Sequence, residues 1–406
     1  MVGLRLHSLH AALLVAVLAA AVPRAYGDGA TAGRAGVGTA SSEYVAGQGN
    51  PAALARRSGS RLWLGTAVVR DAVQWQSPDS AAPQATSLSP ARLAPNVGAV
   101  WAGTTWLLGV TAATTSSSEV QLPVPNSDAN DETLGASYPW RLQGIAARWQ
   151  RDDLAAVVTR RMTDTIAVGV GFGVAHVAIR EQRHNATGSI APVSSLQSLR
   201  GTTWSAAGAR VGVVVMPAAL PYELGAAVWW NRGSQLAGSV TAADGNRTEA
   251  SWALPRELGA TASLRRIATR WTLELDGELS SANAGPRLWQ VAGGAAIESR
   301  MQRGVRGEVR LAGDYAVIPG LFWFTAGAGV RRGSPTVQPV SPLFSDFSSV
   351  LVSAGAVVAT DGFAVMFGGT TTFAAQRDSA VAGTLASISS TRSLVGLTVE
   401  YEFGGL

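Results

Sequence analysis

The sequence predicts an all-β protein, a closed antiparallel transmembrane β-barrel of about 14 strands with an N-terminal segment, the hatch, in its lumen. Three observations lead to this prediction. Apolar residues recur at every second position over long segments, the chain begins like an exported protein, and short turns alternate with long polar connections. The alternation indicates strands with one apolar and one polar face. Closure follows because an open sheet edge is not stable in lipid.

Residues 1–27 have the layout of a cleaved signal peptide. Arg5 precedes an apolar stretch from Ala11 to Val22, and small residues follow around Ala25 and Gly27. A membrane-spanning helix needs about 20 apolar residues, so this shorter stretch fits a signal better than an anchor. We expect cleavage after Gly27 and an exported mature protein.

Composition narrows the class of exported protein. Hydrophobic residues make up 47% of the 406 residues, but no later segment is long and apolar enough for a membrane-spanning helix. The absence of cysteine excludes disulfides, thiolate catalysis and cysteine metal sites. The net charge of +5 comes from scattered arginines, without basic runs that interleave with aromatic residues, so we expect no nucleic-acid partner.

The alternation is clearest in residues 393–406, where apolar residues occupy every second position from Val395 to Phe403, and Glu400 and Glu402 lie between them. Residues 271–279 and 305–315 alternate in the same way. A soluble sandwich rarely needs strands this long, whereas a membrane barrel places its apolar face in lipid and its polar face in the lumen. We therefore expect the apolar positions to face lipid, and Phe403 to end the last strand at an interface.

Short turns alternate with long polar stretches, which cover residues 76–94, 117–139, 182–201, 234–250 and 377–391. Residues 287–301 and 334–346 must then belong to outer loops, which leaves 14 strands between Arg61 and Phe403. An even number of strands places both termini in the periplasm. Tryptophans near predicted strand ends are expected to form girdles at the two membrane interfaces; they are Trp75, Trp140, Trp204, Trp229, Trp230 and Trp252.

Residues 28–58 precede the first predicted strand, and residues 59–406 are expected to form the barrel. The leader is rich in glycine, alanine and serine, and it contains an Asn50-Pro51 turn signal followed by the apolar pair Ala53 and Leu54. Turn chemistry and apolar pairs matter only where a chain is ordered. We therefore expect a hatch that packs inside the lumen.

These motifs, taken in order, resemble the FadL family of outer-membrane long-chain fatty-acid transporters. The family's mature N-terminus reads Ala-Gly-Arg-Ala and then, after a variable stretch, Asn-Pro-Ala. The matching residues here are Ala32, Gly33, Arg34, Ala35, Asn50, Pro51 and Ala52. The segments YPWRLQGIAARW and WALPRELG also follow the family's order.

The resemblance implies a 14-strand barrel plugged by a hatch, through which fatty acids or aromatic hydrocarbons pass into the periplasm without an energy source. The start of the chain is also similar to PorV-like barrels, which do not transport but act as secretion or assembly partners. That alternative stays open. The expected location is the outer membrane, and the expected partners are hydrophobic small molecules, outer-membrane lipid and the barrel-assembly machinery.

An apolar solute that leaves a barrel sideways needs a gap in the wall, and glycines can supply the kink. Gly169, Gly171 and Gly173 lie on one face of a predicted strand and are our candidates for this gap. The alternative is that they only make room for the hatch.

We expect no catalytic site, metal site or cofactor. Only His176 and His184 remain after the signal, and no serine accompanies either at a recognisable spacing. The charged residues from Glu274 to Glu278 and from Arg306 to Arg310 are interpreted as a solvated lumen wall.

Overall fold

A computed structural model gives the structure of the 406-residue chain. The residues that it describes are 32, 34, 49–56, 59–77, 84–87, 89–123, 146–185, 195–241, 245–254, 256–282, 287–291, 296–299, 305–333, 348–381 and 384–403. The predicted signal peptide and the last three residues lie outside this part of the chain. None of the described helices is long and apolar enough to cross a membrane.

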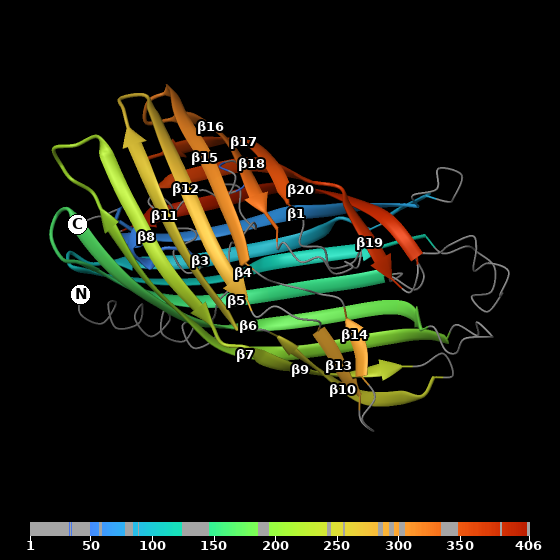
Figure 1. The fold of residues 1–406 in the computed structure, drawn as a ribbon. Helices are drawn as coiled ribbons and strands as arrows, with labels where there is room; N and C mark the ends of the chain where they lie inside the picture. Colours follow the sequence, from blue (N-terminus) through green and yellow to red (C-terminus); the bar gives the residue numbers. More distant parts are fainter. Residues whose placement is uncertain are drawn as a thin grey trace.

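Within the described residues, 14 long strands form one closed antiparallel barrel (Figure 1). In ring order these are β1 (Ser60–Gln76), β3 (Arg92–Ala102), β4 (Trp106–Gln121), β5 (Ala146–Arg161), β6 (Ile166–Asn185), β7 (Ser195–Val215), β8 (Tyr222–Asn231), β11 (Glu257–Ile267), β12 (Trp271–Ala282), β15 (Val305–Ile318), β16 (Phe322–Arg332), β17 (Ser349–Thr360), β18 (Phe363–Ala374) and β20 (Thr384–Phe403). β20 closes the ring on β1, from Ser60 opposite Phe403 to Gln76 opposite Ser387. The predicted fold class and strand number are confirmed.

Short strands extend the sheet at one end of the ring. They are β2 (Gln84–Thr86), β9 (Ser234–Thr241), β10 (Arg247–Leu254), β13 (Arg287–Val291), β14 (Ala296–Ser299) and β19 (Arg377–Val381). β13 and β14 form a hairpin that pairs with β10 outside the ring, so the described residues of this region contribute no ring strand, as predicted. Stretches such as 234–250 were expected to be loops but are largely strand. Their polar side chains show that these strands extend into water, and backbone pairing continues there.

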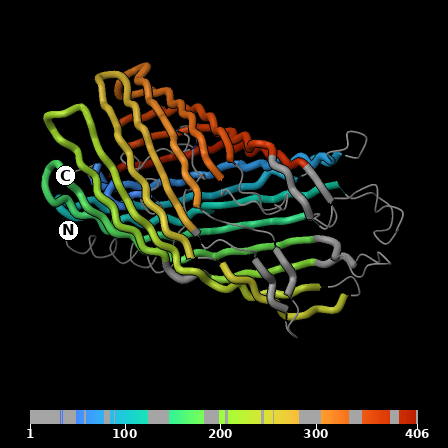
Figure 2. The backbone as a smooth tube through the Cα atoms, viewed as in Figure 1, coloured from blue at the N-terminus to red at the C-terminus, as the bar shows by residue number. Residues whose placement is uncertain are grey.

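Figure 2 shows that the wall around β6 and β7 runs much further toward this end than the wall around β16. β6 and β7 have 20 and 21 residues, whereas β16 has 11. A strand of about 9–11 residues already crosses the hydrocarbon layer. The longer strands therefore carry the barrel well beyond its lipid-facing band on one side.

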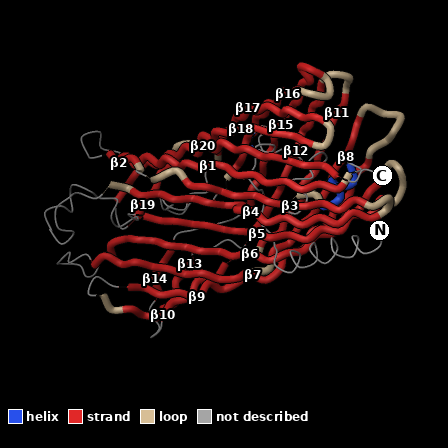
Figure 3. The backbone as a smooth tube through the Cα atoms, turned by 180° about the vertical axis from the view of Figure 1, so that it is seen from behind, coloured by secondary structure: helices blue, strands red, loops and turns tan. Residues whose placement is uncertain are grey.

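Tight turns join the strands at the other end (Figure 3). Gly320 and Gly362 lie in two of these turns with φ of +79° and +78°, a left-handed conformation that other residues adopt only with strain. Aromatic side chains gather close by: the Arg160 guanidinium lies 5.2 Å from the Trp106 ring, and that of Arg266 lies 5.2 Å from the Trp271 ring. These contacts mark an interfacial girdle at the turn end.

Exposure alternates along the strands as the sequence predicts. Leu273 and Leu275 on β12 are 42% and 47% exposed on the outer face, while Glu274 and Asp276 are 0% and 2% exposed on the inner face. In β20, Leu397 faces outward and Glu400 is buried inside. A slip of one residue would place these carboxylates in hydrocarbon, so the alternation determines the register.

The predicted tryptophan girdle is only partly correct. Trp204 and Trp230 are exposed on the outer face, but Trp75, Trp229 and Trp252 are at most 2% exposed and point into the barrel. Their position in the two-residue period places them on the inner face, where they pack with other side chains. Trp140 lies outside the described residues.

Candidate functional site

The interior of the barrel is apolar where the wall extends beyond the lipid-facing band. Trp149 and Trp252 meet there edge to face, with 6.2 Å between ring centroids. The buried members of this outer apolar cluster are Val73, Trp75, Ala85, Val120, Leu122, Ala147, Trp149, Ala175, Val177, Ile179, Leu199, Leu236, Val240, Ala250, Trp252 and Ile388. They come from β1, β2, β4–β7, β9, β10 and β20 and from the start of the connection after β4.

Charged side chains occupy the barrel interior between the outer apolar cluster and the tight turns. Arg310 is 1% exposed, and its Nε lies 2.8 Å from Glu308 Oε1. Arg265 Nη1 donates to Glu223 Oε2 at 2.9 Å. The prediction of a solvated charged wall is therefore wrong for Glu274, Asp276 and Arg310, which are at most 2% exposed. Arg310 also lies 3.9 Å from Glu278 of the neighbouring strand, and the N-terminal segment contacts Glu274.

Ala32 and Arg34 of the predicted hatch lie inside the barrel. Arg34 Nη2 donates to Glu274 Oε2 at 2.9 Å, and Arg34 Nε lies 3.3 Å from Asp314 Oδ1. The carbonyl oxygen of Ala32, which is completely buried, accepts a hydrogen bond of 2.5 Å from Thr370. This part of the leader is thus tied to β12, β15 and β18. Gly33 and Ala35 lie outside the described residues.

Asn50 and Pro51 form an ordered turn that leads into the short 3-10 helix η2 (Pro51–Arg56). Asn50 Oδ1 accepts the Ala52 N–H at 3.0 Å, and Asn50 Nδ2 donates to the Val213 carbonyl at 2.9 Å. The Pro51 carbonyl accepts the Thr159 hydroxyl at 2.5 Å. These contacts hold Asn50, Pro51 and Ala52 against β5 and β7.

The end of η2 is also fixed to the wall. Arg161 Nη2 donates to the Ala55 carbonyl at 3.2 Å, and Arg56 Nη2 lies 3.0 Å from Glu223 Oε2. Leu54 packs in an apolar cluster with Trp63, Val100, Leu107 and Val157. The tight turns lie close to η2, drawn in blue in Figure 3.

Gly169 lies directly under η2. A Cβ atom built on Gly169 would be 2.5 Å from the Pro51 carbonyl carbon, which no packed structure accommodates. Backbone pairing runs past Gly169 and Gly171 on both sides, and a register shift against β7 occurs between Gly173 and Ala175. Gly169 thus makes room for the N-terminal segment, while the wall gap predicted at Gly169, Gly171 and Gly173 stays a prediction.

The wall between β3 and β4 is paired over only part of its length. Pairing runs from Ala102 opposite Leu107 to Asn96 opposite Ala113, and residues 92–95 pair only with β1. β4 has a register shift against β5 between Thr114 and Ser116 at the same level. Pro95, which lacks an N–H donor, lies in the unpaired part.

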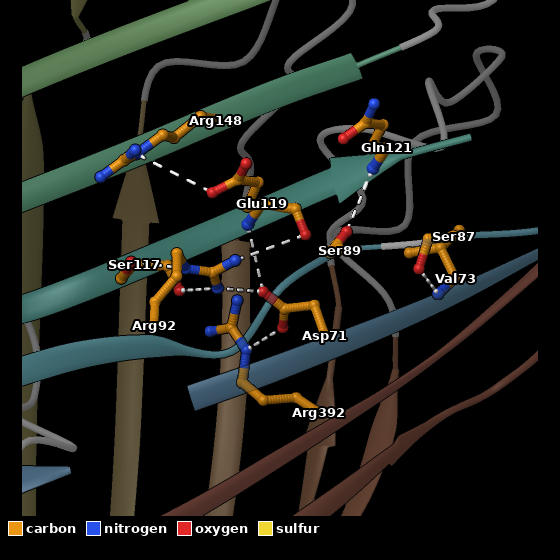
Figure 4. A network of polar contacts seen from close by, with 10 residues as sticks. All are labelled: Asp71, Val73, Ser87, Ser89, Arg92, Ser117, Glu119, Gln121, Arg148 and Arg392. Carbon is orange, nitrogen blue, oxygen red and sulfur yellow. Dashed lines mark hydrogen bonds and ion pairs between the residues drawn. The ribbon is translucent and has the colours of Figure 1, made fainter. Parts of the chain in front are cut away.

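Side chains bridge this break (Figure 4). Arg92 Nε donates to Ser117 Oγ at 2.9 Å, and Arg92 Nη2 donates to the Ser117 carbonyl at 3.2 Å and to Asp71 Oδ2 at 2.5 Å. Asp71 Oδ2 also accepts the Glu119 N–H at 3.3 Å, and Asp71 Oδ1 accepts from Arg392 Nε at 2.6 Å. We call Asp71, Arg92, Ser117 and Arg392 the Asp71 latch. It takes the place of the missing backbone bonds between β3 and β4.

Two serines from the connection between β1 and β3 extend the bridge. Ser87 Oγ accepts the Val73 N–H at 2.9 Å, and Ser89 Oγ accepts the Gln121 N–H at 3.1 Å (Figure 4). Sequence reasoning missed this region. A proline inside an otherwise regular strand could have indicated the break, because charged residues nearby occupy positions that face the barrel interior.

A cavity of about 430 Å³ lies in the lumen at the turn end, next to Arg34 and Arg56. Polar residues in its lining include Arg265, Asp314 and Glu400. Apolar residues lie beside them in the lining, and these are Ala316, Trp323, Val357, Ala359, Ala364 and Met366. The mixed lining can contact both an apolar molecule and a polar group attached to it.

His176 lies on the outer face of β6 and does not form a catalytic arrangement with the described residues. His176 Nδ1 is 3.8 Å from Asp152 Oδ2, and the neighbouring Thr114 hydroxyl donates to Asp152 and not to the histidine. Among the described residues, no group of three histidine or carboxylate side chains is placed to hold a metal ion.

No family model matches the sequence, and no curated protein matches it. Solved structures do match. A Pseudomonas aeruginosa FadL homologue has a TM-score of 0.78 at 15% identity, covering 94% of this chain and 99% of that chain. The P. putida toluene transporter TodX has a TM-score of 0.71 at 13% identity, covering 94% and 99%.

The Ralstonia pickettii toluene transporter TbuX has a TM-score of 0.69 at 12% identity, covering 93% of this chain and 98% of its own. The chain shares the fold of these three proteins. The resemblance to the FadL family noted in the sequence is thus confirmed at the level of the fold. All three similar structures are described as transporters or as a FadL homologue, and none as an enzyme.

Proposed function

We propose that this protein is a passive channel that carries hydrophobic molecules, such as long-chain fatty acids or aromatic hydrocarbons, across the bacterial outer membrane into the periplasm. The short turns and both termini then lie in the periplasm, and the long connections face outward. The fold shared with a FadL homologue and with toluene transporters supports this proposal. Outer-membrane lipid surrounds the barrel, and the barrel-assembly machinery inserts it.

The observation that carries the proposal is the cavity of about 430 Å³ beside Arg34 and Arg56. A transporting barrel needs interior space for its cargo, whereas a barrel that acts only as a secretion or assembly partner does not. Burial of an apolar solute against Trp323, Val357 and Met366 would supply a favourable free energy of binding. The cavity therefore favours transport over the partner alternative.

Two further features suggest a route for the cargo. The outer apolar cluster makes the barrel interior apolar beyond the membrane, where polar sugars slow a hydrophobic solute. The break between β3 and β4 lies beside Leu93, which is 70% exposed on the outer face, so the break lies in the part of the wall that faces lipid. We place a lateral exit at this break, with the Asp71 latch as its closure and residues 28–58 as the hatch that keeps water-soluble molecules out.

The test is uptake by cells that express the protein, compared with an empty vector. Expression should raise the uptake of a long-chain fatty acid or of toluene, and should leave that of a small sugar unchanged. Ala359→Trp fills the cavity and should lower this uptake at least fivefold. Ala354→Trp, which changes an exposed alanine on the outer face of the same strand, is the matched control. Uptake equal to the empty vector for several apolar solutes would support the partner alternative.

A further inference from the structure

Arginines from β5, β6 and β7 form a row across the outer face of the barrel. The strand register places Arg148 directly opposite Arg180, and Arg180 directly opposite Arg200. All three side chains are exposed, while the residues on either side of each, such as Trp149, Ile179 and Leu199, are buried inside. Neighbouring strands lie about 4.8 Å apart, so the Cα atoms of the three arginines fall within about 10 Å of one another, and their side chains project from the same face.

The row has little compensating charge of its own. Arg148 Nε lies 3.9 Å from Glu119 Oε2, a surface pair of low energy. Arg180 and Arg200 form no ion pair with any other residue in the described part of the chain. Like charges directly opposite each other on a sheet are destabilising. An external anion would remove this repulsion.

The row also lies at a particular height on the wall. The outward positions of β6 are apolar up to Val174, and the exposed Trp204, opposite His176, marks the interface that follows. Arg180 is six residues beyond Val174, about 15 Å further along the membrane normal for a strand tilted by about 40°. This position is above the hydrocarbon layer, among head groups and the sugars attached to them.

We propose that Arg148, Arg180 and Arg200 bind the phosphate groups of an outer-leaflet glycolipid. Planar guanidinium groups match phosphate oxygens with paired hydrogen bonds, and a row of three can hold two phosphates or one phosphate from several directions. The acyl chains of the same lipid lie against the apolar outer face below the row, which includes Phe172 and Val211. The interaction requires only that the long connections face outward, and it is independent of any cargo.

The experiment titrates the purified full chain in detergent micelles with lipid A that carries both phosphates, and repeats the titration with dephosphorylated lipid A. The row variant is Arg148→Gln with Arg180→Gln and Arg200→Gln. The control has the same change in charge and replaces Arg70, Arg247 and Arg332 by Gln, which are exposed on three separate strands. Retention of the folded, heat-modifiable form in electrophoresis shows that each variant is a barrel.

The row variant should bind phosphorylated lipid A at least tenfold more weakly than the wild type, and the scattered control should bind within twofold of it. Raising the salt concentration from 0.05 to 0.5 M should weaken wild-type binding, since exposed charges are screened. Equal binding of dephosphorylated lipid A, or equal losses in the two triple variants, would overturn the proposal. Inorganic phosphate at 10 mM should displace little lipid; complete displacement would identify a site for free phosphate and would also overturn it.

Discussion

Asp71 and Arg92 form an ion pair, with 2.5 Å between Oδ2 and Nη2, at the point where β3 no longer pairs with β4. Arg92 donates to Ser117 of β4 as well, so one guanidinium group joins β1 to β4 across the start of β3. Both charged side chains are buried. The integrity of the wall at this level depends on side chains, whereas elsewhere in the ring it depends on the backbone.

Removal of the Asp71 carboxylate should weaken the barrel. Asp71→Asn leaves the buried Arg92 with neutral acceptors in place of its carboxylate partner, and loss of one partner of a buried ion pair costs roughly 3–5 kcal/mol. The free energy of unfolding, measured by denaturant titration in lipid vesicles, should fall by about this amount. Glu249→Gln changes an exposed carboxylate and is the control. A decrease below about 1 kcal/mol would show that the latch does not hold the wall.

The hatch should limit conductance. Deletion of residues 30–55 removes the contacts of Arg34 with Glu274 and of Asn50 with Val213, and should leave a wider lumen. Planar bilayers should therefore show a larger conductance for the deleted protein than for the intact protein, and cargo uptake should change. If the truncated barrel assembles, conducts no more than the intact one and transports equally well, residues 28–58 are only a tether.

A larger residue at Gly169 should displace η2. The new Cβ atom would collide with the backbone of Pro51 and Ala52, and overpacking of this kind costs roughly 1–3 kcal/mol. Gly169→Val should therefore make the N-terminal segment more sensitive to added protease. Gly277→Val is the matched control, because the nearest atom to a Cβ there is 3.9 Å away. Equal protease sensitivity of both variants and the wild type would contradict the contact.

A charged substitution on the outer face should destabilise the barrel more at the middle of the membrane than at its edge. Leu275 lies in the middle of β12 and is 47% exposed, so Leu275→Arg should lower the free energy of unfolding in lipid vesicles by roughly 2–4 kcal/mol. Leu321 lies at a tight turn, and Leu321→Arg should cost about 0–1 kcal/mol. Equal losses of unfolding free energy at the two positions would contradict the assignment of Leu275 to the membrane centre and of Leu321 to its edge.

Local patterns in the chain were sufficient to predict the fold class, the strand number and the faces of the strands. The side-chain period of two is a property of each strand alone, so Leu273 and Glu274 could be assigned to opposite faces without knowledge of their neighbours. Tight turns also depend on residues close in sequence, and each one makes two successive strands neighbours in the ring. Polar composition was a poorer guide, because it does not separate a loop from a strand that continues into water, as in residues 234–250.

The sites depend on tertiary structure. Asp71, Arg92 and Arg392 are distant in sequence, and only closure of β20 on β1 brings them to one break in the wall. The row of Arg148, Arg180 and Arg200 exists because two strand registers coincide, and the burial of Glu274 depends on Arg34 inside the lumen. Period and turn chemistry act between residues near in sequence, whereas register across the ring and the filling of its interior are decided by contacts that form only when the barrel closes.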